Sequence, residues 1–242
     1  MSAPTAFLTG LRTSTAALLH GIVAERWTDA DVRAPSLLPG WTRGHVLSHI
    51  ARNADGITRT LSAALRGEIA ARYPDGTDGR NADIEAGATR GFAELAADVR
   101  ESADRLDRLF GAVADADGWE LPTEDRPARD YVAARWREVE IHRVDLAGAY
   151  PPDEWPAEFV AYLLPVLADG LGKRGAAAMR IEVAPEGSVT TDLGGRVWTV
   201  GDGDGDPVSV IGPDWALLAW LVGRPAAASA ALSATPELPQ WA

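Results

Sequence analysis

The chain has 242 residues, a formal net charge of −12 and no cysteine. This length is enough for one large domain or two ordinary ones, each with its own core. The negative charge argues against nucleic-acid binding, and the lack of cysteine excludes disulfides, cysteine zinc sites and a catalytic thiol of the chain itself. No run reaches the ~18–20 apolar residues that span a membrane, and the N-terminus does not resemble a signal peptide. We therefore expect a cytoplasmic monomer that binds no nucleic acid and no membrane.

The first half of the chain predicts four long helices. Apolar residues recur at helical spacing over residues 4–25, 43–66, 83–114 and 129–149. Thr42 is a suitable N-cap for the second of these helices. The glycine- and proline-containing stretch over 67–82 predicts a long irregular connection, and its part over 67–79 is a candidate for lining a pocket. Four such helices favour an antiparallel bundle, whose core can hold a metal site built from facing side chains.

The pattern changes after residues 150–156 (YPPDEWP), which we interpret as a linker. The elements expected beyond it are a helix over 156–173, strands over 179–184, 196–200 and 208–211, and a helix over 213–223. The sequence therefore predicts an α+β protein, with a four-helix bundle over 1–150 and a small α+β domain over 151–242.

Histidines are few, and two pairs of residues are spaced i, i+4. Glu138 and His142 lie about 40° apart on the helical wheel, so they share one face of the fourth predicted helix. Glu140 lies about 160° from His142 and is excluded from that face. In the other pair, His49 lies about 40° nearer the apolar stripe than His45, so His49 is the one expected to point toward the interior of the bundle.

These side chains suggest a metal site. Two histidines and one glutamate form the ligand set of catalytic zinc sites, which keep one position open for water or substrate. The net positive charge left on such a site favours an incoming thiolate or another anion. A Glu–His pair at this spacing is also common as a solvated pair or a structural hydrogen bond. Asp145, one turn beyond His142, is interpreted either as a partner of the histidine or as a charge at the helix end, and the second interpretation is preferred.

Four segments resemble one family. Residues 38–54 (LPGWTRGHVLSHIARNA), 80–87 (RNADIEAG), 137–146 (REVEIHRVDL) and 220–224 (WLVGR) are similar, in this order, to motifs of the mycothiol-dependent maleylpyruvate isomerases. The resemblance implies a DinB-like bundle followed by a small α+β domain. It also implies a divalent metal, zinc or another, held by His49, Glu138 and His142, and a functional arginine at Arg224. An arginine at the end of a helix also complements the helix dipole, which is the alternative reading of Arg224.

The resemblance implies a reaction in which mycothiol is the thiol cosubstrate. Its metal-bound thiolate would add to the C2=C3 bond of maleylpyruvate, the bond would rotate, and loss of the thiolate would give fumarylpyruvate. Arg224 would hold a carboxylate of this small anionic substrate and offset the developing charge. Two alternatives stay open: a thiol S-transferase that retains the adduct, and a non-enzymatic module whose metal is closed by Asp145 or His45. In the isomerase, His45 would orient His49 or move a proton.

Overall fold

A computed structural model describes residues 4–201 and 207–239 of the chain. The chain divides into two compact units, Met1–Ala149 and Tyr150–Ala242. The predicted domains, 1–150 and 151–242, begin and end at residues 1 and 242, which lie outside the described residues. No helix among the described residues is long and apolar enough to cross a membrane.

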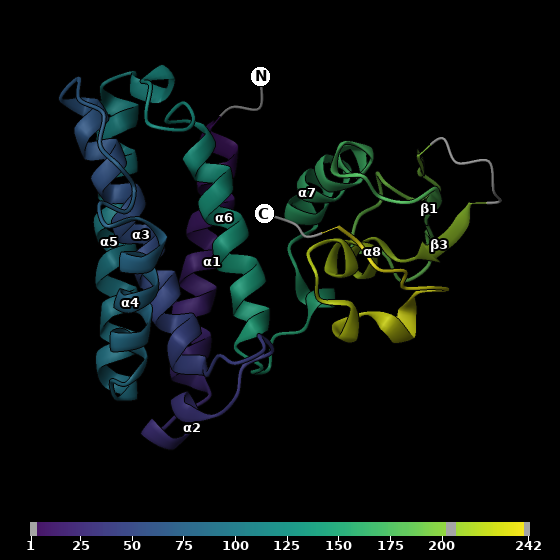
Figure 1. Ribbon diagram of the computed structural model, residues 1–242, viewed down its shortest axis with the longest axis horizontal. Helices are drawn as coiled ribbons and strands as arrows, with labels where there is room; N and C mark the ends of the chain where they lie inside the picture. The colour runs from purple at the N-terminus through teal and green to yellow at the C-terminus, as the bar shows by residue number, and fades with distance from the viewer. Residues whose placement is uncertain (1–3, 202–206, 240–242) are drawn as a thin grey trace. The chain divides into compact units, whose positions relative to one another are not determined.

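The first unit is built from helices. They are α1 (Pro4–Ala24), α2 (Asp29–Arg33), α3 (Arg43–Leu65), α4 (Gly76–Ala88), α5 (Phe92–Asp115) and α6 (Asp130–Asp145), with a short 3-10 turn, η1, at Gly118–Glu120. Helices α1 and α3 each pack against both α5 and α6, so these four form a bundle, and α4 lies against α3 (Figure 1). The interior is apolar along α3, where Leu47, Ile50, Ile57 and Leu61 are fully buried.

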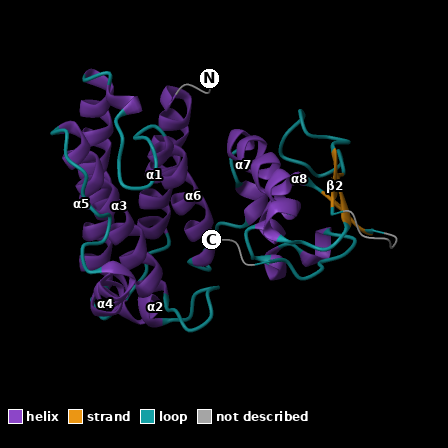
Figure 2. Cartoon of the chain, turned by 45° about the horizontal axis from the view of Figure 1, so that its top comes forward, coloured by secondary structure: helices purple, strands orange, loops and turns teal. Residues whose placement is uncertain are grey.

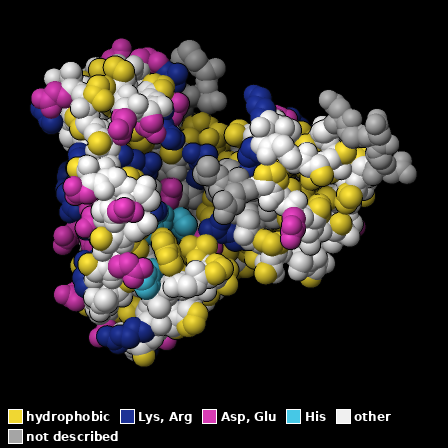
Figure 3. All heavy atoms as spheres, viewed as in Figure 1, with side chains coloured by type: hydrophobic (Ala, Val, Ile, Leu, Met, Phe, Trp, Pro, Cys, Tyr) yellow, Lys and Arg dark blue, Asp and Glu magenta, His cyan; other side chains and the backbone are white. Residues whose placement is uncertain are grey.

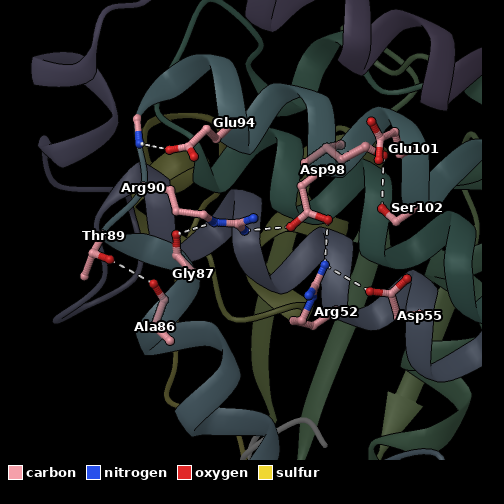
Figure 4. Close-up of polar contacts among 12 residues, drawn as sticks. Arg52, Asp55, Ala86, Gly87, Thr89, Arg90, Glu94, Asp98, Glu101 and Ser102 are labelled. Carbon is pink, nitrogen blue, oxygen red and sulfur yellow. Dashed lines mark hydrogen bonds and ion pairs between the residues drawn. The ribbon is translucent and has the colours of Figure 1, made fainter.

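The prediction of one continuous helix over 83–114 is wrong, because this part of the chain forms two helices, α4 and α5. Helix α4 begins at Gly76, inside the stretch expected to be irregular, and Arg90 lies in the break before α5. The Arg90 guanidinium donates to the Gly87 carbonyl at 3.0 Å and to Asp98 on α5 at 2.6 Å. Asp98 also accepts from Arg52 on α3, as Figure 4 shows. This network fixes the break against α3, and local periodicity does not report such contacts.

The last helix of the bundle ends earlier than the 129–149 expected from sequence. Helix α6 stops at Asp145, and Ala147 has a left-handed φ of 53°. Arg43 on α3 donates to the carbonyls of Leu146 at 2.7 Å and Ala147 at 2.8 Å. These charge-assisted bonds satisfy carbonyls at the end of the helix, which explains why the chain turns there.

The second unit holds the described strands (Figure 2). Its elements are α7 (Ala157–Gly170), β1 (Met179–Val183), β2 (Val197–Val200), β3 (Val208–Gly212) and α8 (Asp214–Leu221), with 3-10 turns η2 (Pro152–Glu154), η3 (Gly172–Arg174), η4 (Pro225–Ala227) and η5 (Ser229–Ala231). The sheet order is β2-β1-β3, with β1 antiparallel to β2 and parallel to β3. Helix α7 packs against α8 and β2. The α+β class expected from sequence is confirmed.

Candidate metal centre

Three side chains from two helices meet in the bundle. His49 projects from α3, and Glu138 and His142 project from α6. His49 Nε2 lies 2.9 Å from Glu138 Oε2 and 3.0 Å from His142 Nε2, and the latter two atoms are 3.4 Å apart. One potential ligand atom from each of these three residues lies within 4.8 Å of the other two. Among the described residues, no other histidine, aspartate or glutamate side chains form such a group of three.

The spacing of these atoms fits a zinc ion. Ligands at about 2.0–2.1 Å from a tetrahedral zinc lie roughly 3.3 Å from one another, close to the separations seen here. The side chain of His49 is only 6% exposed, whereas the side chains of Glu138 and His142 are 29% and 15% exposed. The cluster is therefore buried on one side and reachable on the other, and histidine side chains are visible on the surface of this unit beside hydrophobic ones (Figure 3).

Asp145 is the last residue of α6, and it is a partner of His142, the less favoured of the two sequence interpretations. Its Oδ2 lies 2.8 Å from Nδ1 of His142, and the residue is fully buried. The carboxylate accepts the Nδ1 proton and leaves Nε2 of His142 turned toward the cluster. A carboxylate behind a ligating histidine in this way fixes the tautomer and the ring orientation.

His45 and Glu140 lie outside the cluster, as the helical wheel predicts. His45 caps its own helix: the Thr42 amide donates to its Nδ1 at 3.1 Å, while its Nε2 pairs with Glu85 at 3.2 Å. Its ring also stacks on Trp41 with a centroid separation of 6.0 Å. Both ring nitrogens are thus engaged away from His49, so the expectation that His45 orients His49 is wrong.

The surroundings of the three side chains shift their pKa values in different directions. Burial lowers the pKa of His49 to about 4, so this ring is neutral near neutral pH. Burial opposes ionisation of Glu138, but hydrogen bonds from His142 and His49 outweigh it and hold the pKa of this carboxyl well below its usual value. For His142, bonds to Asp145 and Glu138 outweigh burial and raise the pKa. Glu138 and His49 are thus in the states that a metal binds, whereas at His142 a metal has to displace a proton.

Two arginines near the cluster were not identified as site residues from sequence. Arg135 is 2% exposed and donates to the Ile50 carbonyl and to Asn53 Oδ1, both at 2.8 Å. It therefore links α6 to α3, one turn before Glu138, and burial lowers its pKa to about 10. Arg80, on α4, places Nη2 3.0 Å from His49 Nδ1. Arg80 opens the 80–87 motif, which was the one signal in the sequence that pointed to it.

Arg224 belongs to the second unit. It follows Gly223, whose φ is 80°, just after the end of α8. Its Nη1 donates to the Val222 carbonyl at 2.6 Å, a contact typical of an arginine at a helix end. It also lines a pocket of about 530 Å³ formed by the end of α8 and residues 235–239. Its role in binding a carboxylate stays a prediction.

Comparisons with known proteins agree with this architecture. The family model of the mycothiol maleylpyruvate isomerase N-terminal domain matches residues 11–147. Crystal structures of a mycothiol-dependent maleylpyruvate isomerase and of a histidine-to-alanine mutant both superimpose with a TM-score of 0.84. In each case the identity is 26%, over 98% of this chain and 97% of the other. No curated protein sequence matches. Because the family model covers more than half of the sequence, the chain belongs to the mycothiol-dependent maleylpyruvate isomerase family.

Proposed function

We propose that this protein is a cis–trans isomerase that converts maleylpyruvate to fumarylpyruvate with mycothiol as cosubstrate. The proposed metal is a divalent ion, zinc or another, held by His49, Glu138 and His142. The observation that carries the proposal is the convergence of these three ligand atoms from α3 and α6. Its support also includes the match to structures of mycothiol-dependent maleylpyruvate isomerases.

The contacts around the cluster favour an open site over a closed structural one. A closed zinc site requires a fourth protein ligand. The two candidates named from sequence are engaged elsewhere: Asp145 accepts from His142 Nδ1, and His45 is held by Thr42 and Glu85. We infer that the fourth position takes an external molecule, and a thiol at this position would have to come from such a molecule because the chain contains no cysteine.

The residues of the chain hold the site ready for this reaction. When bound, the metal supplies a Lewis acid that lowers the pKa of the incoming thiol. Asp145 fixes the ring of His142, and Arg135 fixes α6 against α3, so the three ligand atoms stay in place. Arg224 holds a substrate carboxylate and offsets the negative charge that develops on the keto acid.

The reaction consumes no reagent, because the thiolate that adds to the substrate is released again. The thiolate sulfur forms a bond to one carbon of the C2=C3 double bond, whose electron pair moves onto the conjugated carbonyl. The remaining single bond rotates, and the electron pair then returns to expel the thiolate. The product is fumarylpyruvate, and the thiol is regenerated for the next turnover.

The test combines metal analysis with an isomerisation assay. The zinc-loaded protein, mycothiol and maleylpyruvate should give fumarylpyruvate while the thiol concentration stays constant. His49→Ala and His142→Ala should lose stoichiometric zinc and at least about 10³-fold in kcat/KM, because each removes a ligand. His20→Ala is the matched control, since His20 is exposed on α1. Arg224→Lys should raise KM, because an ammonium group does not replace a bidentate guanidinium.

Two outcomes would contradict the proposal. Stoichiometric consumption of the thiol into a stable adduct would show an S-transferase instead. Wild-type protein that binds zinc but produces no fumarylpyruvate would leave the family's reaction unsupported for this chain.

A further inference from the structure

A cavity in the first unit lies between α1 and α5 and shares no residue with the candidate metal centre. Its volume is about 180 Å³, and α6 contributes Arg135 to its lining. Apolar side chains of both facing helices form its walls: Leu11 and Leu19 of α1, and Ala103, Leu106 and Phe110 of α5. The candidate metal ligands come from α3 and α6 instead, so the cavity is a separate feature of the bundle.

Arg135 places a positive charge beside these apolar walls. The residue is only 2% exposed, and its Nη1 donates to two neutral oxygens, the Ile50 carbonyl and Asn53 Oδ1. The other N–H groups of the guanidinium form no hydrogen bond to a described residue, and no carboxylate of a described residue lies within 4.0 Å of its nitrogens. A buried charge is costly unless it is paired, so Arg135 favours an anion in the cavity.

The acidic residues that line the cavity lie on its exposed side. Asp107 pairs with Arg12 of α1 at 2.6 Å, and these two side chains are 47% and 50% exposed. Asp104 is exposed as well. Solvent screens the charges on this side, whereas the charge of Arg135 lies in the interior, where its attraction for an anion is stronger. The two aspartates therefore do not neutralise the buried arginine.

We propose that this cavity binds a small carboxylic acid with an apolar body. The carboxylate accepts charge-assisted hydrogen bonds from Arg135, and the apolar body contacts the walls formed by α1 and α5. A cavity of about 150 Å³ lined by leucine, isoleucine and phenylalanine accepts benzene, so the volume found here suits a body the size of one benzene ring. This site goes beyond the proposed function and does not depend on it.

Calorimetric titration of the full chain with benzoate tests the site, and benzamide is the neutral counterpart. Benzoate should bind with one equivalent per chain. Benzamide should bind at least about tenfold more weakly, because a hydrogen bond to an ionised acceptor is stronger than one to a neutral acceptor. Zinc-loaded and chelator-treated protein should bind benzoate equally well, since no candidate metal ligand lines the cavity.

Two variants test the cavity and its charge separately. Ala103→Leu places a larger side chain in the cavity and should weaken benzoate binding at least about tenfold. Arg135→Met removes the cation and should weaken benzoate binding about 10–100-fold. Toluene carries no charge and should bind Arg135→Met at least as well as the wild type, which shows that the variant is folded and keeps the cavity. The control is Ala112→Leu, since Ala112 is exposed on α5, and it should leave benzoate binding unchanged.

Any one of four results overturns the inference: no benzoate binding by the wild type, equal binding of benzoate and benzamide, unchanged benzoate binding in Ala103→Leu, or unchanged benzoate binding in an Arg135→Met protein that binds toluene. Benzoate binding by the zinc-loaded protein alone also overturns it, because the acid would then bind at the metal. If Arg135→Met does not fold, the benzamide comparison and Ala103→Leu decide. None of these measurements uses turnover, so failure of the proposed function leaves them unaffected.

Discussion

His49 and His142 each place Nε2 in the cluster and form a hydrogen bond through Nδ1 to a residue outside it. His142 gives Nδ1 to the buried Asp145 carboxylate, whereas Nδ1 of His49 accepts from the Arg80 guanidinium. The two histidines therefore differ in the partner of Nδ1: that of His142 is a carboxylate, which accepts, and that of His49 is a guanidinium, which donates.

Asp145→Asn is expected to weaken zinc binding about 10–100-fold, the loss typical when the partner behind a ligating histidine is changed. The amide carries less negative charge than the carboxylate and holds the His142 ring less firmly. A competitive chelator titration at fixed pH measures the affinity. Asp115→Asn, at the exposed end of α5, is the control. Equal zinc affinity in the wild type and Asp145→Asn would show that Asp145 does not support the ligand.

At the scale of elements, contacts between helices position the site. Arg135 ties α6 to the Ile50 carbonyl of α3, and Arg43 ends α6 by binding the carbonyls that follow it. The break between α4 and α5 turns α4 back along α3, which brings Arg80 to His49. Each of these contacts joins segments that are distant in sequence.

In the second unit, Asp214 links the start of α8 to a loop. It is fully buried and accepts from the amides of Val189 and Thr190, both at 2.8 Å, and from that of Trp215 at 2.7 Å. Asp214→Ala leaves these amides without their acceptor, so the free energy of unfolding should fall by about 3 kcal/mol. Urea unfolding followed by circular dichroism measures the change.

Asp192→Ala is the control for this prediction, because Asp192 is exposed in the same unit. A loss below about 0.5 kcal/mol in Asp214→Ala would contradict the role assigned to the buried carboxylate.

At the scale of the whole molecule, the candidate metal ligands all belong to the first of two compact units. A ligand that binds only the folded state stabilises it by mass action, by about 2.7 kcal/mol at a free concentration one hundred times its Kd. Zinc should therefore raise the unfolding temperature of the first unit, and a chelator should reverse the rise. Differential scanning calorimetry of the full chain tests this expectation. A zinc-dependent rise of the same size in His142→Ala would show that the ion binds elsewhere.

The sequence alone determined those features that depend on local spacing. Glu138 and His142 share a face because they are one helical turn apart, and the wheel separated His49 from His45 for the same reason. Helical and strand-like patterning also indicated the α+β class. The family motifs then indicated the same three residues as candidate metal ligands.

Only the tertiary structure decided how these pieces meet. His49 faces Glu138 across 89 positions of chain, and Arg80 reaches His49 across 31. The break between α4 and α5 is fixed by Arg90, which donates to Asp98 on α5. The end of α6 is fixed by Arg43 on α3, which donates to the Leu146 carbonyl. Periodicity reports which face of a helix is apolar, but not which side chain of another helix packs against it. The carboxylate behind His142 and the guanidinium on His49 therefore became visible only in the folded chain.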